Sequence, residues 1–229
     1  MAPRLDRRPS LIVFDVNETL SDMGPMGERF AAVGAPEHLA RTWFAALLRD
    51  GFALTAAGSN PSFVDVGRDV LGSMLAPHVD DVEAAVEHVM AGFGQLGVHP
   101  DVVEGVQALR DLGVPLVTLS NGATSVAQGL FERHGLDDAF DRLLSVEDAP
   151  RWKPAPQAYA HALDVCGVAA SDAMLVAVHP WDVHGAHEAG LQTAWVDRSG
   201  TSYPAHFARP DLKVGSLVEL ASVLEGATD

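Results

Sequence analysis

Short runs of apolar residues divide the chain into two kinds of region. Residues 11–14 (Leu-Ile-Val-Phe) are apolar throughout, as is typical of a strand buried on both faces of a parallel sheet, and Asp15 follows directly. From residue 97 onward, similar runs alternate with segments of helical spacing. Strands that alternate with helices predict an α/β fold, a doubly wound parallel sheet with right-handed crossovers. The expected strands are 11–14, 114–119, 143–146, 174–178 and 193–196, and the expected helices 101–112, 124–134, 154–166, 183–189 and 214–224.

The second kind of region has helical spacing and no strand pattern. Leu39, Trp43 and Leu47, for example, fall on one face of a helix. The four expected helices are 25–33, 37–49, 62–75 and 79–93, separated by segments rich in glycine and proline. Four helices in series predict a helical bundle inserted after the first strand. We therefore expect an α/β core domain from residues 1–20 and 97–229, and an inserted helical domain from residues 21–96.

Composition and charge narrow the range of partners. The net charge of −16 argues against a nucleic-acid backbone or an anionic membrane surface. A small anionic substrate remains compatible, because positive charge inside a cleft can outweigh the net field. The single cysteine excludes an intramolecular disulfide and a multi-cysteine metal site. The oligomeric state stays open, with a homodimer among the alternatives.

The N-terminal residues favour a cytoplasmic location. Residues 4–8 are mostly charged, and the apolar run after them is too short for the hydrophobic core of a signal peptide. No apolar stretch approaches the length of a membrane span.

Reactive side chains follow the ends of four expected strands. Ligands of open parallel sheets bind outside the carboxyl ends of the strands, so we expect these side chains to lie together. They are Asp15 after the first strand, Ser120 and Asn121 after the second, Lys153 beyond the third, and His179, Trp181 and Asp182 after the fourth.

Each of these residues also has an ordinary structural interpretation. Asp15, Ser120 and Asn121 are common turn formers. Lys153 precedes a proline and could be a solvated loop lysine, and Asp182 could be the N-cap of a helix that begins at residue 183. Trp181 could be a core residue or a contact to the inserted helices.

Four motifs in this order resemble the haloacid dehalogenase-like superfamily. They are Phe14-Asp15-x-x-x-Thr19-Leu20, Leu119-Ser120-Asn121-Gly122, Lys153-Pro154, and the segment 178–186 with Trp181-Asp182. The resemblance implies a Rossmann-like α/β core, an aspartate nucleophile, and a cap domain that corresponds to the helical insertion.

Asn17 separates two branches of that superfamily. Its magnesium-dependent phosphatases have a second aspartate two residues after the nucleophile as general acid, whereas this chain has an amide that cannot deliver a proton. Asp15 and Asp182 alone would also make a poor Mg²⁺ site. Two alternatives stay open: a Mg²⁺-dependent phosphatase, and a catalytically silent member that serves as a binding module.

The motifs look closest to the L-2-haloacid dehalogenases (type II). These enzymes carry Trp-Asp followed by Gly-Ala, as here at residues 181–186, and a tyrosine that matches Tyr159. The resemblance implies that Asp15 displaces halide from a short 2-haloacid and forms an ester that water hydrolyses, without a metal or other cofactor. Lys153 would keep Asp15 ionised, supported by Tyr159, and Asp182 would position the water. The implied substrate-binding residues are Asn17, Thr19, Arg41, Ser120, Asn121, Tyr159 and Trp181.

The chain departs from that pattern at three places. Ala177 stands where the family has serine, and His179 where it has asparagine. The family also uses an arginine from the first cap helices, for which Arg41 or Arg29 could substitute. Because histidine takes up and releases protons near neutral pH, we hypothesise that His179 and Asp182 together activate water. The alternative is that His179 fills space or bonds a backbone carbonyl.

Overall fold

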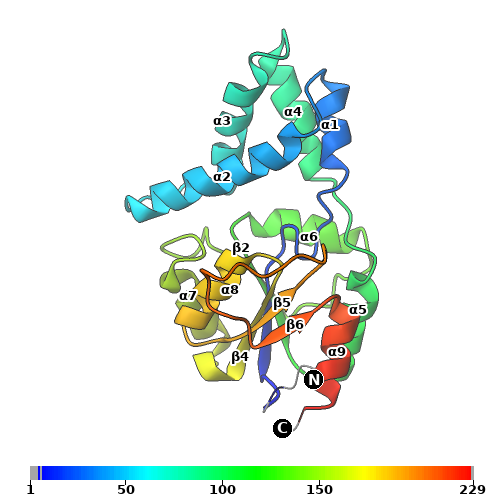
Figure 1. The fold of residues 1–229 in the computed structure, drawn as a ribbon, viewed down its shortest axis with the longest axis vertical. Coiled ribbons are helices and arrows are strands. Elements are labelled where there is room, and N and C mark those ends of the chain that lie inside the picture. The colour runs from blue at the N-terminus through cyan, green and yellow to red at the C-terminus, as the bar shows by residue number, and fades with distance from the viewer. Residues whose placement is uncertain (1–4, 6, 228–229) are drawn as a thin grey trace.

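A parallel six-stranded sheet forms the centre of the described chain (Figure 1). The computed structural model describes residue 5 and residues 7–227, so the ends of the expected core domain, at 1–4 and 228–229, lie outside the described residues. The strand order is β3-β2-β1-β4-β5-β6. This order reverses at β1, which is the switch point at which doubly wound sheets bind their ligands. The strands are β1 (Leu11–Phe14), β2 (Leu116–Ser120), β3 (Arg142–Ser145), β4 (Ala173–Ala177), β5 (Gln192–Val196) and β6 (Leu212–Val214).

Helices cover both faces of the sheet. Alternate residues of β1 enter opposite cores: Leu11 and Val13 pack in one, and Ile12 and Phe14 in the other. This is the side-chain alternation expected of a strand buried on both faces. The first core contains residues of α7 (Pro156–Cys166) and α8 (Pro180–Glu188), and the second contains residues of α5 (Val102–Asp111), α6 (Thr124–Glu132) and α9 (Leu217–Glu225).

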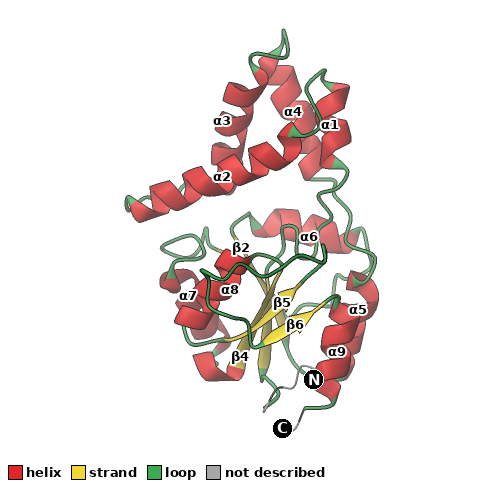
Figure 2. Cartoon of the chain, in the orientation of Figure 1, coloured by secondary structure: helices red, strands yellow, loops and turns green. Residues whose placement is uncertain are grey.

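The inserted helices form a separate layer beyond the ends of the strands (Figures 1 and 2). Trp43 is fully buried among them, and its indole nitrogen donates to the Gly67 carbonyl over 2.9 Å. An antiparallel bridge between Ser21 and Val98 joins the chain segments that leave and re-enter the core. The helices are α1 (Met26–Ala32), α2 (Leu39–Ala56), α3 (Phe63–Leu75) and α4 (Val82–Phe93).

The α/β fold class predicted from the sequence is confirmed, and several element boundaries are corrected. Helix α8 begins at Pro180, where proline suits the first helical position, so the interpretation of Asp182 as the N-cap was wrong. Val214 ends a strand that was not predicted, and α9 begins only after Ser216, whose hydroxyl accepts from the Glu219 amide. Helix α2 continues to Ala56, well beyond the expected end at residue 49. Among the described residues, no helix is both long and apolar enough to cross a membrane.

Candidate active site

Asp15 lies directly beyond the carboxyl end of the central strand β1. Its amide continues the sheet by donating to the Val176 carbonyl over 3.1 Å, which fixes the backbone from which the carboxylate projects. One carboxylate oxygen accepts from the Lys153 ammonium at 2.8 Å, and the other accepts from the Thr19 hydroxyl at 2.6 Å. The Val178 amide donates to that hydroxyl, which leaves its proton directed at Asp15. The carboxylate is thus held from both sides.

Lys153 is completely buried and bridges two carboxylates. Its ammonium lies 2.8 Å from Asp15 Oδ1 and 2.6 Å from Asp182 Oδ2. Asn121, directly beyond β2, binds the lysine backbone twice: its side-chain oxygen accepts from the Lys153 amide at 2.9 Å, and its side-chain nitrogen donates to the Lys153 carbonyl at 3.2 Å. These two bonds fix the segment from which the lysine reaches the nucleophile.

Asp182 is held as tightly as the lysine. It lies in the first turn of α8, and its second oxygen accepts from the Tyr159 hydroxyl at 2.6 Å. Gly185 allows this approach, because a Cβ there would lie only 2.6 Å from Pro154 and from the Tyr159 hydroxyl oxygen. Tyr159 therefore supports Lys153 through Asp182. We call this set the polar floor: Asp15, Thr19, Asn121, Lys153, Tyr159 and Asp182.

Burial and neighbouring charges shift the pKa values of the two aspartates of the polar floor in opposite directions. Burial alone would raise the pKa of Asp15, but the Lys153 ammonium, His179 and the Thr19 hydroxyl bring it below the ordinary value. The pKa of Asp182 is raised, because burial and the Asp15 charge outweigh Lys153. Despite burial, the two carboxylates raise the pKa of Lys153, and burial raises the pKa of Tyr159 well above its usual range. Asp15 is therefore an ionised carboxylate at neutral pH, facing a charged lysine.

His179 projects over the nucleophile from the N-terminus of α8. Its Nε2 lies 3.1 Å from the Asn17 carbonyl oxygen, 3.7 Å from Asp15 Oδ2 and 3.6 Å from Glu18 Oε2. A carbonyl oxygen can only accept, so Nε2 carries the hydrogen in this arrangement. The imidazole ring stacks on Trp181 with centroids 5.0 Å apart, and on Phe44 of α2 with centroids 6.3 Å apart.

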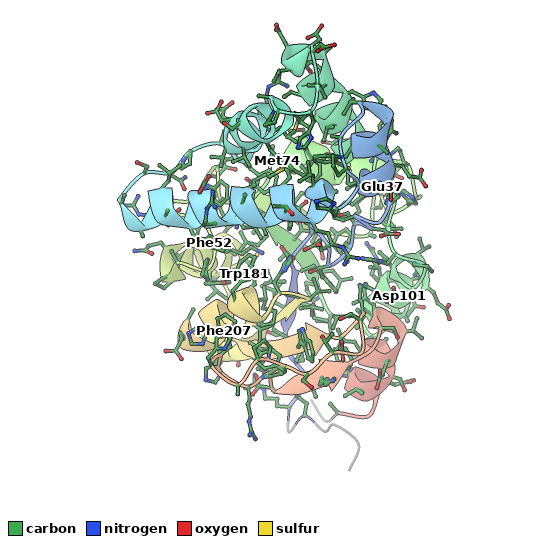
Figure 3. All side chains as sticks on the ribbon, turned by 45° about the horizontal axis from the view of Figure 1, so that its top comes forward. Glu37, Phe52, Met74, Asp101, Trp181 and Phe207 are labelled. Carbon is green, nitrogen blue, oxygen red and sulfur yellow. The ribbon has the colours of Figure 1, made fainter. Side chains whose placement is uncertain are left out.

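Aromatic residues of the inserted helices pack against rings of the core domain, His179 among them. Trp152 is fully buried and packs so closely on α2 that a Cβ at Gly51 would lie 2.1 Å from its ring. Its indole nitrogen donates to the Pro61 carbonyl at 2.9 Å. In Figure 3, Phe52 of α2 lies beside Trp181 of α8, and their centroids are 4.9 Å apart. We call this set the aromatic roof: Phe44, Phe52, Phe63, Trp152 and Trp181.

Comparisons with known proteins agree with this geometry. The model of a family described as haloacid dehalogenase-like hydrolase matches residues 9–190. The chain belongs to this hydrolase family. The (S)-2-haloacid dehalogenase 4A of Burkholderia cepacia is 30% identical over 93% of each chain. The resemblance predicted from the four motifs is therefore confirmed.

Solved structures show the same relationship along the whole chain. A dehalogenase described with an intermediate complex superposes with a TM-score of 0.90 at 28% identity, covering 98% of this chain and all of that one. L-2-haloacid dehalogenase from Xanthobacter autotrophicus gives a TM-score of 0.86 at 26% identity, over 96% of this chain and all of that one. The same enzyme has been solved with chloropropionic acid covalently bound, and that structure gives a TM-score of 0.86 at 25% identity with the same coverage.

The hydrolase brings most of the predicted site residues together, and it places others differently. Ser120 is the buried last residue of β2, and its hydroxyl oxygen accepts from the Gly122 amide at 2.9 Å. Arg41 is exposed and lines an open pocket of about 750 Å³ on the outer side of His179. The Arg29 guanidinium donates to the Gln95 side-chain oxygen at 3.3 Å. Asn17 is nearly buried, and its carbonyl receives His179.

Sequence reasoning missed three residues at this site of the hydrolase. Phe44 stacks on His179, and Trp152, which directly precedes Lys153, packs against Gly51 of α2. The apolar face predicted for segment 37–49 was assigned to Leu39, Trp43 and Leu47 and did not include Phe44. Glu18 has a φ of 61° and a carboxylate facing His179. Nothing in its local sequence indicated either property.

The donor set of the polar floor does not fit a magnesium ion. Mg²⁺ needs carboxylate oxygens that are free to coordinate it. Here the Lys153 ammonium occupies the position between Asp15 and Asp182, and Tyr159 and Thr19 bind the remaining oxygens. Across residues 5 and 7–227, no group of three or more His, Cys, Asp or Glu side chains could hold a metal ion.

Proposed function

We propose that this hydrolase cleaves the carbon–halogen bond of short 2-haloacids, with Asp15 as the nucleophile. The observation that carries the proposal is the buried Asp15 carboxylate, kept ionised by the Lys153 ammonium at 2.8 Å. An ionised carboxylate shielded from water is a competent nucleophile toward carbon. The (S)-2-haloacid dehalogenases among the relatives support this choice of substrate.

In the first half-reaction, Asp15 attacks the carbon that bears the halogen. The carbon–halogen bond breaks with inversion, halide leaves with the electron pair, and an Asp15 ester forms. Halide leaves without a proton, so an amide at position 17 does no harm to this step. A phosphate ester would need a protonated leaving group, and Asn17 offers no acid for it.

In the second half-reaction, water attacks the carbonyl carbon of the Asp15 ester. Lys153, at one carboxylate oxygen, stabilises the negative charge that develops there. Asp182 has both oxygens engaged by Lys153 and Tyr159, which supports a role in positioning the lysine more than in binding water. The Nε2 hydrogen of His179 faces Asn17 and Asp15. This supports a role for His179 as a hydrogen-bond donor that orients groups around the ester, rather than as the base that takes a proton from water.

We further propose that residues 21–96 act as a cap that excludes water from the first half-reaction. Phe44 and Phe63 of the inserted helices are buried and pack against each other, and Phe63 stacks on the buried Trp152 of the core. Exclusion of water strengthens the electrostatic interactions inside the site. Arg41 would attract the anionic substrate at the pocket entrance, and the reaction would proceed without a metal. The homodimer considered from the sequence stays a prediction.

A paired assay tests this function. Halide release should follow addition of (S)-2-chloropropionate and should persist after exhaustive EDTA treatment. Phosphate release from p-nitrophenyl phosphate with added Mg²⁺ should stay at background. Phosphate release that requires Mg²⁺, without halide release, would establish a phosphatase instead. Release of neither product from a panel of both substrate classes would favour a binding module.

A further inference from the structure

Glu18 holds an unusual backbone conformation close to the nucleophile. Among the described residues, it is the one non-glycine residue with a positive φ, at 61°. A side chain in the left-handed region is strained, and such strain persists only where the surroundings enforce it. The Glu18 amide donates to the Ser21 hydroxyl at 3.2 Å, and its carbonyl accepts from His99 Nε2 at 2.9 Å. Both bonds use the backbone, so they do not account for a glutamate side chain.

The Glu18 side chain joins the buried site to solvent. Its carboxylate lies 3.6 Å from His179 Nε2, the same nitrogen that faces Asp15 at 3.7 Å. The Glu18 side chain is 39% exposed, whereas that of Asp15 is 5% exposed. Glu18 and His179 both line the open pocket of about 750 Å³. A carboxylate that faces the reaction from one side and solvent from the other can carry protons between them.

Hydrolysis of a haloacid produces a proton inside a site that is otherwise closed. A haloacid and one water yield a hydroxy acid, a halide and one proton in each turnover. In the polar floor, Lys153 and Asp182 are fully buried. Tyr159 is a neutral donor with a raised pKa, and Lys153 stays protonated. The proton therefore needs an acceptor at the edge of the site.

We propose that Glu18 accepts the proton that the hydrolytic water loses and releases it into the open pocket; this rests on the proposed function. Water oxygen bonds to Cγ of the Asp15 ester while one water proton passes to the Glu18 carboxylate. The ester bond to the substrate then breaks, and the departing alkoxide takes the second water proton. This step restores the Asp15 carboxylate, while the His179 N–H stays bonded to the Asn17 carbonyl.

Glu18→Gly is the most informative variant, because glycine adopts this φ without strain. The variant removes the carboxylate and keeps both backbone hydrogen bonds. With (S)-2-chloropropionate we expect about one equivalent of halide at the wild-type rate, followed by turnover reduced by about tenfold to a hundredfold. Mass spectrometry should show the Asp15 ester accumulating. Rising concentrations of imidazole buffer should restore turnover in the variant and leave the wild type unchanged.

Two further variants separate a chemical role from a structural one. Glu18→Gln keeps the side-chain length and should show the same defect as Glu18→Gly. Glu37→Gln, which alters another carboxylate lining the same pocket, should behave as wild type. The melting temperature of Glu18→Gly should equal or exceed that of the wild type, which excludes unfolding as the cause.

The outcomes distinguish this inference from the proposed function. Normal turnover of Glu18→Gly and Glu18→Gln beside an active wild type would overturn the role of Glu18 alone. Loss of the halide burst, or a defect that imidazole does not relieve, would also overturn it. A wild type that releases no halide from any 2-haloacid would overturn the proposed function, and the role of Glu18 with it.

Discussion

The polar floor contains the nucleophile, and the aromatic roof stacks on His179 beside it, but the two are built in different ways. In the polar floor, charged and polar atoms are paired through directional bonds of 2.6–3.2 Å. In the aromatic roof, the contacts are ring packing at centroid distances of 4.9–6.4 Å. Loss of one buried partner leaves a charge uncompensated, whereas a change of ring shape can be absorbed by neighbouring side chains. The reaction should therefore depend on the polar floor much more sharply than on the aromatic roof.

The largest effect is expected from Asp15→Asn in the polar floor. The amide is a poor nucleophile, so halide release should fall by at least about a thousandfold. Circular dichroism should show an intact fold, because the variant keeps the size of the side chain and a possible bond to Thr19. A folded variant with more than about a tenth of the wild-type rate would remove Asp15 from the reaction.

The second prediction uses the two lysines of the chain as a matched pair. Lys153→Met leaves Asp15 and Asp182 buried without a cation, which should lower turnover by about a hundredfold or more and destabilise the fold by about 3–5 kcal/mol. Lys213→Met removes an ion pair to Asp197 from a side chain that is 54% exposed. That change should cost about 1 kcal/mol, because Lys213 is largely exposed and Asp197 still accepts from the Thr201 amide, and it should leave turnover unchanged. Similar urea-denaturation midpoints and rates for the two variants would contradict a special role for Lys153.

The third prediction tests the aromatic roof through two helical glycines. Gly51→Ala would place a Cβ 2.1 Å from the Trp152 ring, so the indole or α2 must shift. We expect a loss of about 1–3 kcal/mol in stability and a rise of about threefold to tenfold in KM. Gly72→Ala in α3 meets no atom within 4 Å and should stabilise the protein by about 0.5–1 kcal/mol. Thermal unfolding of both variants checks the comparison, and equal shifts in Tm would show that Trp152 and α2 are loosely packed.

The smallest effect is expected from mild acid. Burial favours a protonated Asp15, but Lys153, His179 and Thr19 lower its pKa below the ordinary value of 3.8. A lowered pKa in the folded state contributes stability above the unfolded pKa, and this contribution is lost only as pH falls toward the folded value. The protein should therefore stay folded, and Asp15 ionised, between pH 7 and pH 5. Single-turnover halide release, which needs the ionised nucleophile, should change by less than about twofold over that range. A tenfold fall over that range would show that burial dominates at Asp15.

Sequence predicted the parts of the site that depend on strand order. Residues 11–14 are apolar at every position, which identified the central strand and placed Asp15 at its end. Lys153 and Asp15 are distant in sequence, yet motif order predicted their proximity, and they lie 2.8 Å apart. The predicted α/β fold follows from the same alternation of strands and helices. These features depend on patterns that local chain segments carry by themselves.

Other features depend on tertiary contacts that no local segment carries. Strand β6 has three residues, and its polar centre Lys213 is exposed, so no strand was predicted there and only Val214 was assigned to the following helix. The left-handed conformation of Glu18 follows from bonds to Ser21 and His99. The two bonds from Asn121 to the Lys153 backbone depend on how β2 lies against the loop after β3. Such contacts have no periodic signature in the sequence.

Trp152 holds the inserted helices against the core domain. Lifting the inserted helices would expose this indole, at about 25 cal/mol for each Å² of apolar surface, and would break its bond to Pro61. Asn60 adds two bonds from the same loop to the Val146 and Ala149 carbonyls. These contacts oppose separation of the inserted helices from the core domain. Because Trp152 precedes Lys153 in the chain, the contacts that hold the inserted helices on the core also fix the segment that carries the counter-ion of Asp15.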